Sequence, residues 1–438
     1  MELDTISPLD GRYGEESAPL LSYFSERANL KYMTRVELAV LNEHLSRQGL
    51  EPLEDLNIDV NEVCRLEETT RHQVKALVNH IQSIIPDYAK PFVHLAITSS
   101  DTQDTANVLR TRDALKREIY PAVEELLRQL VDKMSETAHI PQMGRTHGQH
   151  AVPMTCGWWF TEYVTRIHRV RENMHVPCFG NISGAVGTFR ALSYLYDNPI
   201  QFSEQVCGRL GLTRSECTTQ ILFSDSLVRV LGEINICFGI IANLADDIRN
   251  LQRSEIDEVE ECFYDGQIGS STMPHKHNPW NSEHVKSLWK VATPRYLTFS
   301  MDLISEHQRD LTNSASSRFV FEYLTLFYLA VKRMTRVISG LKIKGGQMLK
   351  HVKGFEDTEK AYVLLARAGV VDAHKVVQRL AERARDSDYW SFRSFLEYSE
   401  YWEKIKDVYD EVGKEDVIQE VVYEMSKWYR KRWSKDQK

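Results

Sequence analysis

Apolar residues recur every three or four positions through most of the 438 residues, which is the spacing of helices that bury one face. One such run begins at about Val123, and its apolar positions are Leu126, Leu127, Leu130, Val131 and Met134. A longer run from about Ser226 to Glu261 contains no proline and predicts a rod of roughly 50 Å. Further helices are predicted from Ser317 to Leu341 and from Ser282 to Gln308, where Pro294 predicts a kink.

Helices of this length can bury their apolar sides only against one another. The predicted fold class is therefore all-α, with a central bundle of long helices. The apolar stripes are broad, so each helix can face neighbours on more than one side. Either a large monomeric bundle covers this surface or further subunits cover it, and the pattern leaves both open.

Changes in helix length divide the chain into three predicted domains. Residues 1–93 form an amino-terminal helical domain, and residues 94–342 form the central domain of long helices, which also carries the oligomerisation surface. After a pair of glycines the helices shorten, as in Thr358–Ala368 and Asp372–Arg385. Residues 343–438 are therefore predicted to form a carboxy-terminal helical domain.

The composition is that of a soluble globular protein, with 42% hydrophobic and 26% charged residues. The formal charge of −8 argues against a general nucleic-acid binder, although a cleft inside an acidic protein can be locally positive. No secretory signal and no membrane span of about 18 apolar residues is visible. Seven cysteines without a Cys-x-x-Cys pair indicate reduced thiols, so a cytoplasmic location is expected.

Polar clusters interrupt the helical pattern at Thr70–Gln73, Thr98–Asp101, Gly144–His150 and Gly269–Pro279. The second cluster precedes a predicted helix, so its hydroxyls and acid either cap backbone N–H groups or bind an anion there. Each cluster alone is weak, because a single histidine such as His147 is more often a structural residue than a catalyst.

The fourth cluster, here called the signature loop (residues 269–279), combines hydroxyls, one lysine, two histidines and an asparagine in a loop that contains two prolines. A site that removes a proton from carbon and then stabilises the negative charge needs such a mixture. Lys276 between His275 and His277 would repel a metal cation, so no metal site is expected.

The signature loop resembles the Gly-Ser-Ser-x-Met-Pro-x-Lys-x-Asn-Pro segment of the fumarase/aspartase superfamily of lyases, which eliminate fumarate from succinyl compounds. Over most of its length the chain also resembles the adenylosuccinate lyase family. The matching segments are Ser7–Tyr13, Arg71–Ala76, Thr98–Asp101, Gly144–Gln149, Ser183–Gly187, Thr219–Gln220 and Gln308–Asp310, followed by Ser314 and Arg318. The signature loop fits any superfamily member, whereas Arg12-Tyr13 and Arg71-His72 are more specific to the purine enzymes.

The resemblance implies cleavage of adenylosuccinate to AMP and fumarate in purine nucleotide biosynthesis, and of succinylaminoimidazolecarboxamide ribotide to AICAR and fumarate. It implies that Ser270 is the base and His147 the acid, while Lys276 and Asn278 stabilise the aci-carboxylate and His72 holds a carboxylate or phosphate. A serine acts as a base only beside a cation or a helix N-terminus, or under a closing loop. The alternative is that Ser270 caps the next helix and another group takes the proton.

The other implied contacts are with the small-molecule substrate. Phosphate and ribose would be anchored by Arg12, Tyr13, Arg309, Ser314 and Arg318, because arginine forks suit phosphate oxygens. The succinyl part would be held by Thr98, Ser99 and Gln220, and Arg71 and Met273 complete the implied set. No metal or organic cofactor is implied, since the substrate's own carboxylate accepts the electrons.

Two segments depart from the pattern of the resembled family. Asn181 stands where many members have lysine, and residues 221–225 lack the usual basic side chains. Both departures remove positive charge near an expected anionic substrate. They bear on the substrate contacts more than on the reaction class.

Helix length also constrains how the clusters meet. If the stretch between Thr98 and His147 is roughly straight, its 40-odd helical residues separate the two by about 60 Å. We therefore predict active sites shared between chains, in agreement with the homotetramer that the resemblance implies. A sharp reversal at Pro121 is the alternative.

Two rival readings remain at this stage. One is another lyase of the superfamily, such as an argininosuccinate lyase or a carboxymuconate cycloisomerase. The other is a structural homologue that has lost activity, and the presence of Ser270, His147, Lys276 and Asn278 together argues against it.

Overall fold

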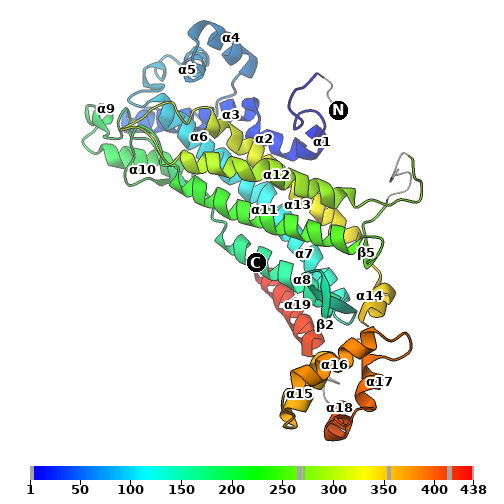
Figure 1. The fold of residues 1–438 in the computed structure, drawn as a ribbon. Coiled ribbons are helices and arrows are strands. Elements are labelled where there is room, and N and C mark those ends of the chain that lie inside the picture. Colours follow the sequence, from blue (N-terminus) through cyan, green and yellow to red (C-terminus); the bar gives the residue numbers. More distant parts are fainter. Residues whose placement is uncertain (1–3, 264–268, 270–271, 353–356, 412–416, 437–438) are drawn as a thin grey trace. The chain divides into compact units, whose positions relative to one another are not determined.

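The computed structural model describes residues 4–263, 269, 272–352, 357–411 and 417–436 (Figure 1). The chain folds into two compact units, each discontinuous in sequence. The first unit comprises residues 1–124, 170–239 and 287–332, and the second comprises residues 125–169, 240–286 and 333–438. The helices that contribute residues to both are α7 Tyr120–Glu136, α8 Cys156–Asn173, α11 Asp225–Leu251, α12 Trp280–Met301 and α13 Val320–Gly340. The division into three domains stays a prediction.

The first unit contains most of the predicted substrate contacts. Its longer elements are α3 Glu26–Arg47, α4 Val60–Thr70, α5 Gln73–Ile84, α6 Ser99–Ala114 and α10 Pro199–Arg209. Its short elements are α1 Gly14–Ser17, η1 Ala18–Leu20, α2 Leu21–Phe24, η2 Lys90–Phe92, η3 Leu115–Ile119, β3 Phe179–Gly180, α9 Arg190–Ser193, β4 Thr213–Arg214 and η4 Ser316–Phe319. Helix α3 packs along α6, and α4 lies beside α5 (Figure 1).

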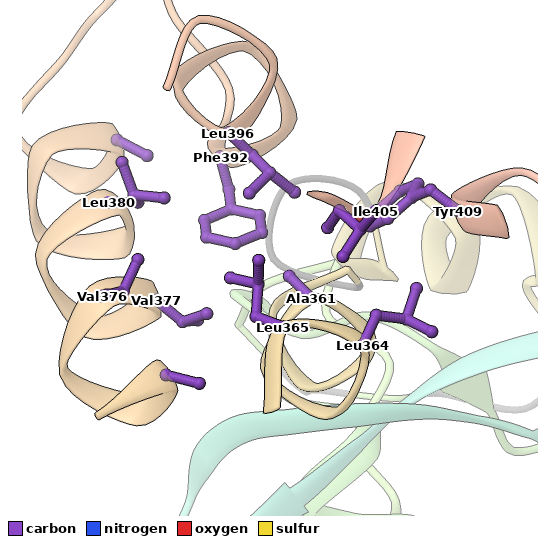
Figure 2. Close-up of a cluster of buried hydrophobic side chains, with 12 residues drawn as sticks. Ala361, Leu364, Leu365, Val376, Val377, Leu380, Phe392, Leu396, Ile405 and Tyr409 are labelled. Atoms are coloured by element: carbon purple, nitrogen blue, oxygen red, sulfur yellow. The ribbon is translucent and has the colours of Figure 1, made fainter. Parts of the chain in front are cut away.

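The second unit combines a β-hairpin with a carboxy-terminal group of short helices. Its elements are β1 Pro141–Thr146, β2 Gln149–Thr155, β5 Val259–Glu260, β6 Lys342–Ile343, α14 Gly345–Val352, α15 Thr358–Arg367, α16 Ala373–Arg385, α17 Phe392–Glu397, η5 Trp402–Lys404, α18 Lys406–Tyr409 and α19 Val417–Asp436. Helices α15, α16 and α17 enclose a small core, in which the buried side chains of Leu365, Leu380 and Phe392 point toward one another (Figure 2).

Most predicted helices are confirmed, but two end earlier than expected. The run from Val123 lies in α7, and the run from Ser317 matches η4 and α13. The predicted helix to Glu261 instead stops at Leu251, because Val259 is buried in the short strand β5 paired with β6. The helix predicted to reach Gln308 ends at Met301, and Pro294 lies inside it.

The protein is mostly helical, but the all-α expectation was incomplete. Among the described residues three two-stranded sheets occur, β1–β2, β3–β4 and β5–β6. The possible reversal at Pro121 is absent, because α7 begins at Tyr120 and continues through the proline. A short π-helix, η3, comes just before α7, and the Tyr120 N–H donates to Leu115 O, five residues earlier. This wider turn accommodates Pro121, which has no N–H donor.

Helix α11 is long and apolar enough to cross a membrane by length and composition alone. Just over half (56%) of its most apolar window is buried inside the protein. Buried core helices of soluble proteins meet the same criterion. The feature therefore gives only weak support for a membrane span.

Candidate active site

The first unit brings His72 and Ser99 together at the starts of two helices. Helix α4 ends at Thr70, the following residue Arg71 adopts a left-handed φ of 51°, and His72 then caps α5. The His72 Nδ1 atom accepts the Lys75 N–H at 3.3 Å, so a proton on Nε2 faces Ser99 Oγ at 3.5 Å. His72 and Ser99 line one pocket of about 450 Å³, together with Lys75, Gln82, His94, Val74, Val78 and Val93.

His94 and Lys75 are pocket residues that the sequence reasoning missed. The His94 Nδ1 atom lies 2.8 Å from the buried Glu37 Oε1, and Thr102 donates to the same oxygen at 2.6 Å. Burial lowers the pKa of His94, but the hydrogen bond and charge of Glu37 outweigh burial and leave that pKa above its ordinary value. A left-handed φ of 57° at His94 is a structural sign that the sequence could not reveal.

The predicted cap at the start of α6 is confirmed. Asp101 Oδ2 accepts the Thr98 N–H at 2.7 Å and the Thr98 hydroxyl at 3.0 Å. Its other oxygen accepts the N–H groups of Ser183 and Gly184, at 2.7 and 3.2 Å. One buried carboxylate therefore joins the helix start to the 183–184 turn.

Gln220 and Arg309 lie together in the first unit. In the amide orientation that satisfies both neighbours, the Gln220 nitrogen donates to Ala185 O at 2.9 Å, and the Gln220 oxygen accepts from Arg309 Nη1 at 3.1 Å. Nearby, Gly187 has a left-handed φ of 71°, and a Cβ there would meet Thr218 O at 2.1 Å. The absence of a side chain at Gly187 therefore allows its backbone to lie close to the Thr218 carbonyl.

The departure at Asn181 has a structural explanation. Its side chain is buried, donates to Gln220 O at 3.2 Å, and accepts from the hydroxyls of Ser183 and Thr218 at 2.6 and 2.9 Å. Asn181 thus fixes the backbone of a predicted substrate-binding residue. A lysine could not accept these two hydrogen bonds.

The other predicted contacts of this unit lie on exposed or partly exposed turns. Arg12 and Tyr13 precede α1, and the Tyr13 N–H donates to Pro8 O at 2.8 Å. Ser314 lies in the turn before η4, and Arg318 lies within η4.

In the second unit, His147 lies at the tip of the β1–β2 hairpin. The pairing of Thr146 with Gln149 leaves His147 and Gly148 as a two-residue loop, with φ values of 55° and 72°. Positive φ at both positions is the signature of a type I′ turn. The turn exposes the imidazole.

A buried carboxylate anchors that hairpin. Glu258 Oε1 accepts from Arg145 at 2.6 Å and lies 2.7 Å from His351 Nδ1, and its Oε2 accepts from Gln142 at 3.0 Å. Burial alone would raise the pKa of Glu258, but the hydrogen bonds from Arg145, Gln142 and His351 outweigh it and leave the pKa below its usual value.

The signature loop is held by its own amide and imidazole. Asn278 Nδ2 donates to Gly269 O at 3.0 Å, so the predicted substrate donor also closes the loop. His277 stacks on Phe263 with ring centroids 4.4 Å apart, and its Nδ1 lies 3.2 Å from Glu260 Oε1. Met273 and Lys276 are exposed, and Lys276 N–H donates to Met273 O. The predicted base, Ser270, lies outside the described residues.

The long helices and the signature loop resemble those of helical lyases of the fumarase/aspartase type. The solved structure of 3-carboxy-cis,cis-muconate lactonizing enzyme from Pseudomonas putida has the same fold. It matches with a TM-score of 0.79 and 23% identity, covering 94% of this chain and 98% of that one.

Comparison with sequence families is more specific. The family model described as Lyase matches residues 11–291. The adenylosuccinate lyase of Thermotoga maritima is 32% identical over 91% of this chain and 93% of its own length. That of Pyrococcus horikoshii is 31% identical over 86% of this chain and 87% of its own length. The chain therefore belongs to the adenylosuccinate lyases of the fumarase/aspartase superfamily.

Proposed function

We propose that this chain catalyses β-elimination of fumarate from adenylosuccinate, giving AMP, and from succinylaminoimidazolecarboxamide ribotide, giving AICAR. The observation that carries the proposal is the 32% identity to an adenylosuccinate lyase over 91% of the chain. The exposed histidine at the hairpin tip and the lysine and amide of the signature loop support it chemically.

In the proposed mechanism, Ser270 takes a proton from the carbon beside a substrate carboxylate. Lys276 and Asn278 stabilise the doubly negative aci-carboxylate that forms, because a cation and an amide donor lower the energy of charge where it develops. His147 then protonates the departing purine nitrogen, and the C–N bond breaks to release fumarate. An imidazole suits this step because its ordinary pKa lies near neutral pH.

Most of the proposed substrate contacts lie in the first unit. His72, which lines the pocket with Ser99, would hold a carboxylate or phosphate of the substrate. Thr98, Ser99 and Gln220 would hold the succinyl part, and Arg309 would bind phosphate oxygens. The remaining predicted contacts are Arg12, Tyr13, Arg71, Met273, Ser314 and Arg318.

We further propose a cytoplasmic homotetramer in which each active site combines clusters from different subunits. Large apolar side chains are exposed on the long helices, among them Ile236, Val291, Leu297 and Met301, and burying them would favour association. The helix that continues through Pro121 supports sharing, because no reversal occurs there. All seven cysteines are unpaired thiols, as expected in a reducing compartment.

An ultraviolet absorbance assay of substrate turnover tests the proposed function. The purified protein is mixed separately with adenylosuccinate, argininosuccinate and 3-carboxymuconate, and absorbance is followed for each. Turnover of adenylosuccinate alone is expected. Inertness toward adenylosuccinate with turnover of another compound would replace the proposal with that other activity.

A further inference from the structure

Asp104 lies one helical turn after the capping residue Asp101, on the same side of α6. Both carboxylates bond to loops outside α6, and Asp101 also caps the helix through Thr98. Asp101 binds the N–H groups of Ser183 and Gly184, and Asp104 Oδ2 accepts the Leu222 N–H at 2.9 Å. The start of α6 therefore fixes two separate turns.

The turn that Asp104 holds contains Gln220. The backbone of Gln220 is bonded on both sides, since its N–H donates to Gln308 O at 3.3 Å and its carbonyl accepts from Asn181 at 3.2 Å. Leu222, two residues later, is the next point of attachment. Without that bond, the hydrogen bonds of Thr218 and Gln220 would still hold the segment up to Gln220, but Leu222 would lose its attachment to α6.

Arg309 interacts both with Gln220 in this turn and with the Asp104 carboxylate. The guanidinium bonds the Gln220 amide oxygen at 3.1 Å, and its charge acts on the Asp104 carboxylate. Asp101, on the same helix, also acts on the Asp104 carboxylate. Asp104 is therefore bonded to the segment that carries Gln220 and interacts with the charge of the arginine that Gln220 binds.

We propose that Asp104 is a positioning residue, whose carboxylate holds residues 219–222 through the Leu222 N–H and so aligns Gln220 with Arg309 for the succinyl nucleotide. The inference rests on the proposed function, in which both side chains bind substrate. It adds a residue that acts through the backbone and does not touch the substrate.

The state of the carboxylate provides an independent check. Burial raises the pKa of Asp104, the Leu222 N–H and the charge of Arg309 lower it, the charge of Asp101 raises it, and the resulting pKa is about 7. A carboxyl whose pKa is raised on folding favours the folded state at low pH, and this contribution is lost as pH rises through about 7. Replacing it by a neutral amide should therefore raise the melting temperature above pH 7, and the gain should vanish toward pH 4.

Two variants separate positioning from simple packing. Asp104→Ala removes the acceptor for Leu222, whereas Asp104→Asn keeps an amide oxygen there. We expect Asp104→Ala to raise KM for adenylosuccinate about tenfold with little change in kcat, and Asp104→Asn to restore most of the loss. Asp87→Asn, an exposed carboxylate of the same unit paired with Lys90, is the control and should behave as wild type.

Amide hydrogen exchange of residues 219–223 provides a readout that does not need activity. Exchange should be faster in Asp104→Ala than in wild type and near wild type in Asp104→Asn. Unchanged exchange in Asp104→Ala, or equal KM values in an active wild type and both variants, would overturn the inference. An inactive wild type would instead end the proposed function, and the exchange experiment would still decide whether Asp104 holds the turn.

Discussion

Replacing Glu258 by glutamine should loosen the hairpin that carries His147. The substitution keeps the shape of the side chain but removes the charge that faces Arg145 and His351. Arg145 has only 16% of its side chain exposed, so solvent compensates little for the lost partner. Breaking one side of a buried ion pair costs about 3 kcal/mol, which corresponds to roughly 150-fold faster opening of the hairpin.

Amide hydrogen exchange of residues 141–155 measures this opening directly, because it reports local unfolding without requiring the whole chain to unfold. The matched control is Glu136→Gln, just before the hairpin. Glu136 forms a surface ion pair with Lys133, and such a pair contributes at most about 1 kcal/mol to stability. Hairpin exchange that is equal in Glu258→Gln and the control would refute the reasoning.

The same variant carries a prediction for pH. The folded-state pKa of Glu258 lies below its ordinary value of 4.5, so its stabilising contribution is present above that value and is lost as pH falls through the folded pKa. Hairpin protection in wild type should therefore decrease on acidification below about pH 4.5. In Glu258→Gln that part of the pH dependence should be missing. Equal acid sensitivity of the two proteins would contradict the assignment.

Three further substitutions test other parts of the account. His147→Gln should lower kcat at least about 100-fold while circular dichroism stays unchanged, and retained turnover would remove its role as acid. Gly187→Ala should destabilise the first unit by about 2 kcal/mol or more in a thermal melt, since its Cβ meets Thr218 O; a neutral effect would mean that the turn relaxes. Leu365→Ala, in a fully buried position of the core shown in Figure 2, should cost about 2–5 kcal/mol by urea unfolding, and a loss below about 1 kcal/mol would indicate a loosely packed core.

The helices could be predicted from the sequence because their apolar spacing is regular, as the run from Val123 to Met134 shows. The predicted end of the helix at Glu261 was wrong, because a buried valine in a short strand has the same polarity as one on a helix face. Val259 was assigned to the helix for that reason.

The hairpin carrying His147 was missed for a related reason. Its two strands are short, and the first contains Gly144, where a register shift interrupts the alternation of side chains. The sequence Thr-His-Gly-Gln was therefore interpreted as a polar cluster after a helix. The two-residue loop containing a glycine was the available signal.

Short motifs in the sequence predict individual site residues, which stay predictions, but they do not predict the residues that support them. Asp104 and Glu258 are ordinary acids on or near helices, and only coordinates reveal that each accepts hydrogen bonds from a distant segment. The role of Asn181 was likewise hidden. The sequence shows that Asn181 replaces a lysine of the resembled family, but it does not show the three hydrogen bonds that the Asn181 side chain forms.

Mixing two inactive variants tests the central claim most directly. His72→Gln and His147→Gln are each expected to be inactive toward adenylosuccinate. If each site takes these residues from different subunits, dissociating and reassembling an equal mixture should restore about one quarter of wild-type fumarate release, because a quarter of the sites receive both native residues. A mixture as inactive as its separate components, with mixed oligomers verified by mass spectrometry, would contradict the account.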